Sequence, residues 1–113
     1  MKVIIAGSRE ITDYDLILRG VLNAGFDITA VISGGAKGVD TLGAQFANEA
    51  NLPLFTFPAE WEKYGRKAGP IRNELMAKFG EGLIAVWDGK SRGTKHMIDR
   101  ATAHGLKIHV ELI

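Results

Sequence analysis

The sequence predicts a domain of the α/β class, built on a mostly parallel sheet of about five strands. Short apolar runs alternate along the chain with segments in which apolar residues recur at helical spacing. Three of these runs also end directly in a glycine-containing turn, which is typical of the connection from a strand to a helix. The length of 113 residues suits one hydrophobic core, so we expect a single domain over residues 1–113.

The N-terminal part predicts a strand followed by a helix. Residues 2–6 form an apolar run that soon meets charged residues, and we interpret it as a strand and not as a signal peptide. Thr12 suits a helix N-cap, with Asp15 three residues later as a shortened capping box. Gly25 marks the end of this helix. Its expected buried face consists of Leu16, Ile17, Val21 and Leu22.

The same order repeats in the next segment. Residues 28–32 are predicted as the second strand, residues 39–50 as a helix and residues 52–57 as the third strand. The residues expected to bury this helix against the sheet are Leu42, Phe46 and Ala47.

Residues 58–69 show no clear periodicity, and a third helix is expected to follow them. Pro70 suits the first position of that helix, because proline has no N–H to leave unbonded there. Gly80 ends it. The apolar positions at helical spacing are Ile71, Leu75, Met76 and Phe79.

The C-terminal part predicts strand, helix and strand. The strands are residues 83–87 and 107–112, and the helix between them begins near Thr94, a candidate cap, and stops at Gly105. Its expected buried residues are Met97, Ile98 and Ala101. Parallel strands joined by right-handed helical crossovers make a Rossmann-like, three-layer α/β/α arrangement.

Composition excludes several broad classes of protein. The net charge of +1 produces no global field that would attract DNA or an anionic membrane. The chain has no cysteine, so disulfides and thiolate chemistry are excluded. No apolar run approaches the roughly 20 residues that span a bilayer. We expect a cytoplasmic protein with no membrane partner.

Glycine turns mark the expected ligand site. Ligands of open α/β sheets lie beyond the carboxyl ends of the strands, where N–H groups at a helix N-terminus attract phosphate. One glycine turn is equally well explained by tight chain geometry, but three such turns favour binding. The glycines at these strand ends are Gly7, Gly34, Gly35, Gly38, Gly89 and Gly93.

Hydroxyls and arginines accompany these glycines. Arg9 and Arg92 are the stronger candidates for a cation that binds the ligand, since a planar guanidinium suits phosphate or carboxylate. For Thr94, a purely capping role is an equally good interpretation. The hydroxyl residues of the turns are Ser8, Ser33, Ser91 and Thr94.

The irregular segment and the helix after it add basic and aromatic residues. Trp61 has two open interpretations: its ring stacks on a base, or it packs at the edge of the core. Arg72 and Asn73 are expected in the first turn of a helix, where a ligand anion is favoured. The exposed cations of the segment are Lys63, Arg66 and Lys67.

Carboxylates near the turns are the candidate catalytic groups. Asp88, Asp40 and Glu74 lie close enough in sequence to matter, although no spacing assigns a role to any of them. Asp40 also suits a helix N-terminus, and Asp88 suits a ribose hydroxyl. His96 is interpreted as a helix-surface residue. The pattern contains no metal site, and no cofactor is required beyond a nucleotide-derived ligand.

Four motifs taken together resemble the SLOG superfamily of DprA-like and LOG-like proteins, and more narrowly its small cpYpsA-related branch of bacteria and phages. The resemblance covers almost the whole chain and rests on residues 6–9, 33–40, 68–73 and 91–94. It implies a Rossmann-like fold. DprA-like members bind single-stranded DNA, LOG-like enzymes cleave the N-glycosidic bond of nucleoside monophosphates, and other members bind nucleotide-derived ligands. Relatives also self-associate, which implies a homo-oligomer.

The resemblance carries over unevenly. Gly93 and Thr94 match the end of the LOG phosphate motif, Pro-Gly-Gly-x-Gly-Thr-x-x-Glu, and Arg72 matches the LOG arginine segment. The double glycine is replaced by residues 89–92, and the catalytic glutamate falls on Met97. Methionine cannot perform acid–base chemistry, so ligand binding is implied more strongly than LOG-type hydrolysis.

Three functions follow as hypotheses. The first is a sensor or binding module for a nucleotide-derived ligand such as AMP, ADP-ribose or NAD. The second is an N-glycoside hydrolase or transferase that uses another carboxylate. The third, single-stranded nucleic-acid binding, is less favoured because the net charge is close to zero and such binding depends on several cations along a groove.

Overall fold

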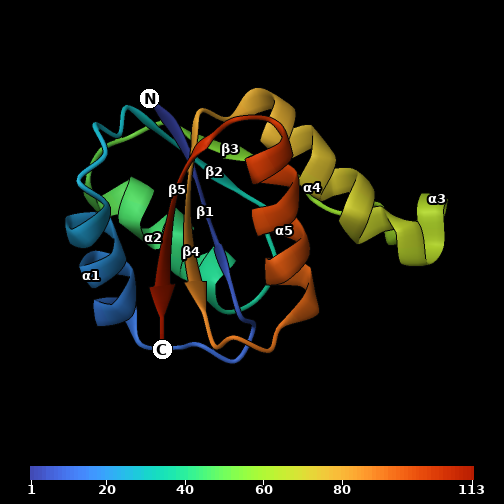
Figure 1. Ribbon diagram of the computed structural model, residues 1–113, viewed down its shortest axis with the longest axis horizontal. Helices are drawn as coiled ribbons and strands as arrows, with labels where there is room; N and C mark the ends of the chain where they lie inside the picture. The colour runs from blue at the N-terminus through green and yellow to red at the C-terminus, as the bar shows by residue number, and fades with distance from the viewer.

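The computed structural model describes all residues 1–113 and contains a five-stranded sheet in which all neighbouring strands are parallel. The strand order is β3-β2-β1-β4-β5. This arrangement confirms the predicted α/β, Rossmann-like fold class (Figure 1). The strands are β1 (Lys2–Gly7), β2 (Ala30–Ser33), β3 (Leu54–Thr56), β4 (Gly82–Trp87) and β5 (Lys107–Leu112).

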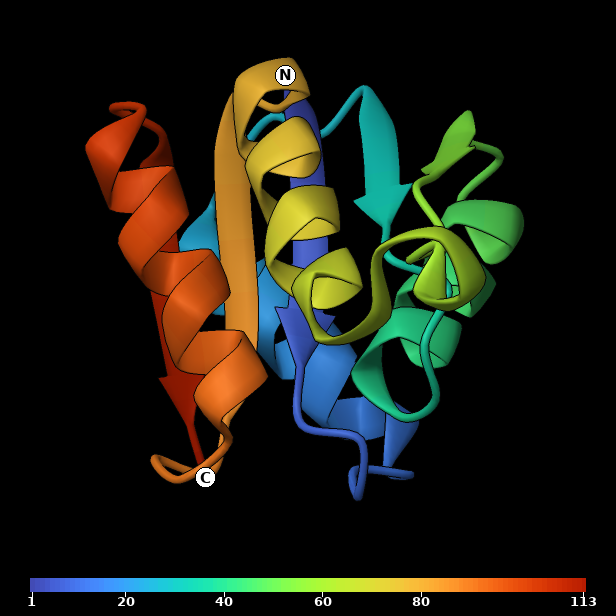
Figure 2. The ribbon, with the colours of Figure 1, turned by 90° about the vertical axis from the view of Figure 1, so that its right-hand side faces the viewer.

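Helices cover both faces of the sheet and make the three layers. Helices α1 and α2 lie on one face, and α4 and α5 lie side by side on the other (Figures 1 and 2). The short helix α3 lies at the outer end of α4, away from the sheet (Figure 1). The helices are α1 (Tyr14–Ala24), α2 (Val39–Glu49), α3 (Trp61–Tyr64), α4 (Ala68–Phe79) and α5 (Arg92–Ala103), with a 3₁₀ turn at Gly65–Lys67.

The central strands are buried on both faces, which explains their unbroken apolar runs. Along β1, Ile4 packs in the cluster under α4 and α5, whereas Ile5 packs in the cluster under α1 and α2. Met76 and Met97 bring α4 and α5 onto the first cluster. Successive side chains of one strand therefore build the two halves of the core.

The chain reverses its direction of travel across the sheet at β1. It adds β2 and β3 on one side of β1, then returns to place β4 and β5 on the other. The crossovers lie on opposite faces to either side of this point, so the carboxyl ends of β1 and β4 open onto a crevice. The topology thus positions a site between the end of β1 and the helices α4 and α5.

Two details predicted for α1 are wrong. Asp13, not Thr12, is the N-cap, and its carboxylate accepts the N–H of Asp15 at 3.0 Å. Both residue types cap helices, and the helix begins one residue later than expected. Leu22 was expected on the buried face but is 81% exposed, because Gly20 and Ile17 bring the helix against the sheet instead.

The segment before α4 is more helical than predicted. Residues 61–67 form α3 and a 3₁₀ turn, and α4 begins at Ala68, so Pro70 is its third residue and not its first. Proline is tolerated there because the first N–H groups of a helix have no partner within it. Arg72 consequently lies in the second turn of α4. Leu75, predicted as buried, is exposed because α5 and the sheet cover the opposite side of α4.

The remaining differences concern element ends. Strand β2 is shifted towards Ser33 relative to residues 28–32, and β3 is shorter than residues 52–57, as an edge strand paired on one side only. Ser91, not Thr94, caps α5, and its hydroxyl oxygen accepts the Thr94 N–H at 3.5 Å. None of the helices is long and apolar enough to cross a membrane.

Candidate functional site

A cleft of about 380 Å³ lies at the carboxyl end of β1, where the topology opens the sheet. This volume is within the usual range for small-ligand sites. Its lining residues come from the end of β1 and the turn after it, from α4 and from the first turns of α5, with Ala36, Asp40 and Trp61 added by the turn of residues 33–40, α2 and α3. Among the predicted ligand-binding residues, those that line it are Gly7, Arg9, Asp40, Trp61, Arg72, Asn73, Ser91, Arg92, Gly93 and Thr94.

The other predicted ligand-binding residues lie near the cleft but do not line it. Several of them belong to the turn of residues 33–40. These residues are Ser8, Ser33, Gly34, Gly35, Gly38 and Asp88.

The turn of residues 33–40 uses its own side chains to satisfy its backbone. The Ser33 hydroxyl accepts the Gly35 N–H at 3.1 Å and donates to the Asp40 carbonyl at 3.0 Å. The Asp40 carboxylate accepts the Ala36 N–H at 3.1 Å. The N–H groups of Gly35 and Ala36 are thus already bonded. The turn holds Asp40 at the cleft wall.

Packing explains three of the glycines. A Cβ on Gly7 would overlap the Val86 carbonyl oxygen of the neighbouring strand. A Cβ on Gly38 would lie 2.5 Å from the carbonyl oxygens of Ser8 and Arg9, and the φ of Gly38 is +74°. A Cβ on Gly34 would overlap the Arg72 guanidinium. These positions need glycine for close approach within the fold.

The Ser8 hydroxyl is buried and has no hydrogen-bond partner in the protein. The principal causes of the lowered Asp88 pKa are the backbone N–H groups of Ser91 and Lys90, at 2.9 and 2.8 Å. Asp88 therefore shapes the turn before α5 and lies outside the cleft lining.

Asp40 and Arg72 are the buried charges of the cleft. Asp40 is 7% exposed, and burial raises the pKa of its carboxyl, opposed by the Ala36 N–H and by the charges of Arg72 and Arg9. Burial likewise lowers the pKa of Arg72, opposed by Asp40. Arg72 donates from Nη1 to the Gly34 carbonyl at 2.7 Å and from Nε to Asn73 Oδ1 at 3.0 Å. Its Nη2 has no hydrogen-bond partner in the protein.

The α5 end of the cleft is open. Arg92 and Gly93 occupy the first turn of α5, where N–H groups have no partner within the helix. A Cβ built on Gly93 would meet nothing within 4 Å. Ser91 and Thr94 bond to each other through their hydroxyls at 3.1 Å, so they chiefly stabilise this helix start.

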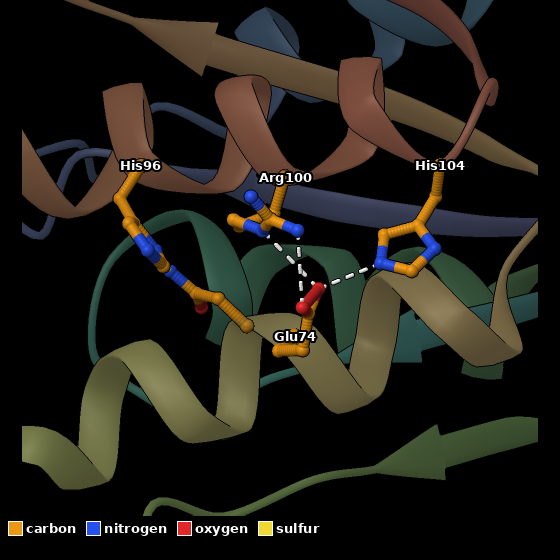
Figure 3. A network of polar contacts seen from close by, with 5 residues as sticks. Glu74, His96, Arg100 and His104 are labelled. Atoms are coloured by element: carbon orange, nitrogen blue, oxygen red, sulfur yellow. Dashed lines mark hydrogen bonds and ion pairs between the residues drawn. The ribbon is translucent and has the colours of Figure 1, made fainter.

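Glu74 lies outside the cleft, in a network between α4 and α5 (Figure 3). Its carboxylate accepts two hydrogen bonds from Arg100, both 3.1 Å, and contacts His104 Nε2 at 2.7 Å. Hydrogen bonds from Arg100 and then from His104 lower the pKa of Glu74. Of the three candidate catalytic carboxylates, Asp40 alone lines the cleft.

Some lining residues were not anticipated as site residues. His96 was expected on the helix surface, but it lines the cleft, and its Nδ1 lies 3.0 Å from Asn73 Nδ2. The spacing in the sequence could have identified this position. His96 and Met97 follow Gly93 by three and four residues, which places them on the same helix face. Met97 is buried in the core beneath the cleft. The other unanticipated lining residues are Ala6, Ala36, Gly69, Pro70 and Met76.

Trp61 lies at the rim. It is 51% exposed, and its ring edge comes near Gly69 at the start of α4. The interpretation of Trp61 as a core-edge residue does not fit this exposure. Its ring is accessible from the cleft.

Comparison with known proteins identifies one matching family and one similar phage protein. The model of the YAcAr family, described as the YspA, cpYpsA-related SLOG family, matches residues 1–64, from β1 through α3. The Gene 61 protein of Mycobacterium phage D29 is 28% identical over 117 residues, which cover 95% of this chain and 93% of that protein. No solved structure matches the chain.

Proposed function

Because this chain belongs to the YspA, cpYpsA-related SLOG family, we propose that its cleft binds a nucleotide-derived small molecule, such as AMP, ADP-ribose or NAD, as a sensor or binding module. The observation that carries the proposal is the grouping of Arg9, Arg72 and Arg92 around one cleft of about 380 Å³. Three guanidinium groups facing one carboxylate leave an excess of positive charge. Such a site favours an anion with several acceptor oxygens.

The α5 end suits the phosphate. The N–H groups of Arg92 and Gly93, which have no partner within the helix, and the positive end of the helix dipole both favour negative charge. Arg92 adds a flexible guanidinium on the same turn, and Gly93 leaves the backbone accessible.

The α4 side suits the rest of a nucleotide. The exposed ring of Trp61 offers a face on which a base can stack. Asp40 offers a carboxylate that can accept hydrogen bonds from sugar hydroxyls. Met76 and Met97 supply an apolar floor.

Calorimetry tests the proposal. We expect AMP, ADP-ribose or NAD to bind and adenosine, which lacks phosphate, to bind more weakly. Arg92→Ala should weaken nucleotide binding by at least about tenfold, because a hydrogen bond to a charged group contributes roughly 1.5–3 kcal/mol. Arg19→Ala, which removes an arginine of α1 on the opposite face, is the matched control. Equal binding of adenosine and AMP, or no binding at all, contradicts the proposal.

A second candidate function rests on Asp40. A buried carboxyl with a raised pKa, lining a ligand cleft, has the character of an acid–base group. It would support cleavage of a nucleotide N-glycosidic bond without the glutamate that Met97 replaces. Chromatography of nucleotides incubated with the protein should then show released base, and Asp40→Asn should abolish the release. Absence of base from every nucleotide tested removes this candidate.

A further inference from the structure

Asn73 joins the glycine turn to helix α5 through a row of hydrogen bonds. It is 6% exposed and lies between Arg72, Gly93 and His96. The row begins at the Gly34 carbonyl, which accepts Arg72 Nη1 at 2.7 Å. It continues from Arg72 Nε to Asn73 Oδ1 at 3.0 Å and ends with Asn73 Nδ2 and His96 Nδ1, also 3.0 Å apart.

The chemistry of these groups assigns the direction of every bond. A guanidinium can only donate, so the Asn73 atom that faces Arg72 must be the oxygen. The amide nitrogen then faces the Gly93 carbonyl, at 3.4 Å, and His96 Nδ1. A carbonyl can only accept, which agrees with this orientation. His96 Nδ1 must therefore accept from Asn73, and the single proton of the neutral ring lies on Nε2.

We propose that His96 presents its Nε2–H to the cleft as a fixed hydrogen-bond donor to an acceptor oxygen or ring nitrogen of the bound nucleotide, with Asn73 as the residue that sets this tautomer. The inference rests on the proposed function for its ligand. His96 projects from α5 towards α4 (Figure 3) and lines the cleft. The donor adds to those of Arg9, Arg72 and Arg92, so the site selects ligands rich in acceptors.

The tautomer is measured without any ligand. Nitrogen-15 NMR of the imidazole rings distinguishes a protonated nitrogen from an unprotonated one. We expect His96 in the wild-type protein to show a protonated Nε2 and an unprotonated Nδ1. Asn73→Asp replaces the amide donor with an acceptor and should move a proton onto Nδ1, while the signals of His104 and His109 stay unchanged. A wild-type His96 protonated on Nδ1 overturns the assignment.

The donor role is measured with AMP by calorimetry. His96→Leu removes the donor and should weaken binding by up to about tenfold, the range of one neutral hydrogen bond. His96→Gln retains an N–H donor and should bind within about threefold of the wild type. Thermal unfolding of each variant checks that it folds. If AMP binds and His96→Leu binds equally well, the donor role is wrong although the proposed function stands. If none of AMP, ADP-ribose and NAD binds the wild type, the proposed function and the donor role both fail, while the NMR measurement still decides the tautomer.

Discussion

The turn of residues 33–40 and the turn of residues 88–94 look alike in sequence but differ in structure. Both follow a buried strand, contain glycines and a hydroxyl, and lead into a helix. Each turn bonds two of its amides to its own side chains, Gly35 and Ala36 in the first and Lys90 and Ser91 in the second. The turns differ at their glycines, because Gly34 and Gly38 of the first turn touch neighbouring segments. In the second, Gly93 faces open space.

This difference separates two reasons for glycine at a strand end. In the closed turn, residues 33–40, glycine allows the chain to pack against Arg72 and against the backbone of Ser8 and Arg9. In the open turn, residues 88–94, packing does not require Gly93, so a ligand has room to approach the backbone there. The comparison indicates that the closed turn serves the architecture, and it supports the proposed role of the open turn in ligand recognition.

The largest expected effect on stability comes from a substitution in the closed turn, and it tests the architectural role of that turn. Gly38→Ala should lower the free energy of unfolding by about 3 kcal/mol or more, because the new Cβ meets two carbonyl oxygens and the φ is positive. Gly105→Ala is the matched control, with a φ of +75° and nothing within 4 Å. It should cost only the strain, about 1 kcal/mol. Urea unfolding measures both, and equal losses would mean that the packing at Gly38 is not important.

Gly34→Ala should have a smaller effect on stability and a clear one on binding. Its Cβ would displace the Arg72 guanidinium, the end of a flexible side chain, so we expect a loss of about 1–2 kcal/mol. Displaced Arg72 loses its bond to the Gly34 carbonyl and no longer holds Asn73. Nucleotide affinity should fall about tenfold. Retained affinity in a folded variant would show that the closed turn does not position Arg72 for the ligand.

The strands and most of the core could be predicted because a parallel sheet covered on both faces needs unbroken apolar runs, as in residues 2–6 and 83–87. Helix starts were less predictable. Thr12 and Asp13 are both capping residues in adjacent positions, as Ser91 and Thr94 are within one turn, and the local sequence does not decide between them.

The site could be predicted only in part, for a physical reason. Position at a strand end identified Arg9 and Arg92, since topology alone brings such residues together. Whether a glycine turn is open or closed depends on distant side chains, here Arg72 from α4 against Gly34. The role of His96 depends on Asn73, which lies on another helix. The local sequence around Gly34 or around His96 does not reveal either of these two contacts.

Asp40→Asn tests the charge held by the closed turn. The pKa of Asp40 is raised in the folded protein, so the folded state favours the protonated form and the charged form costs stability once the pH exceeds both pKa values. The variant keeps an oxygen for the Ala36 N–H and should be more stable at pH 7 by about 1 kcal/mol or less. Urea unfolding should show this gain shrinking as the pH falls towards about 4. A gain that is constant with pH contradicts the assignment.

Gly93→Ala should have the smallest effect on folding, with a sign opposite to that of Gly38→Ala and Gly34→Ala. The position is helical, its φ is not positive and the new methyl group meets nothing, so alanine should stabilise α5 by about 0.5 kcal/mol. The same methyl group occupies the space beside the open N–H groups, so nucleotide affinity should fall several-fold. Urea unfolding and calorimetry on one preparation measure both quantities. A more stable protein with weaker binding is expected only if the open turn serves the ligand and not the fold. Unchanged affinity would remove the distinction between the two turns, because Gly93 would then serve neither.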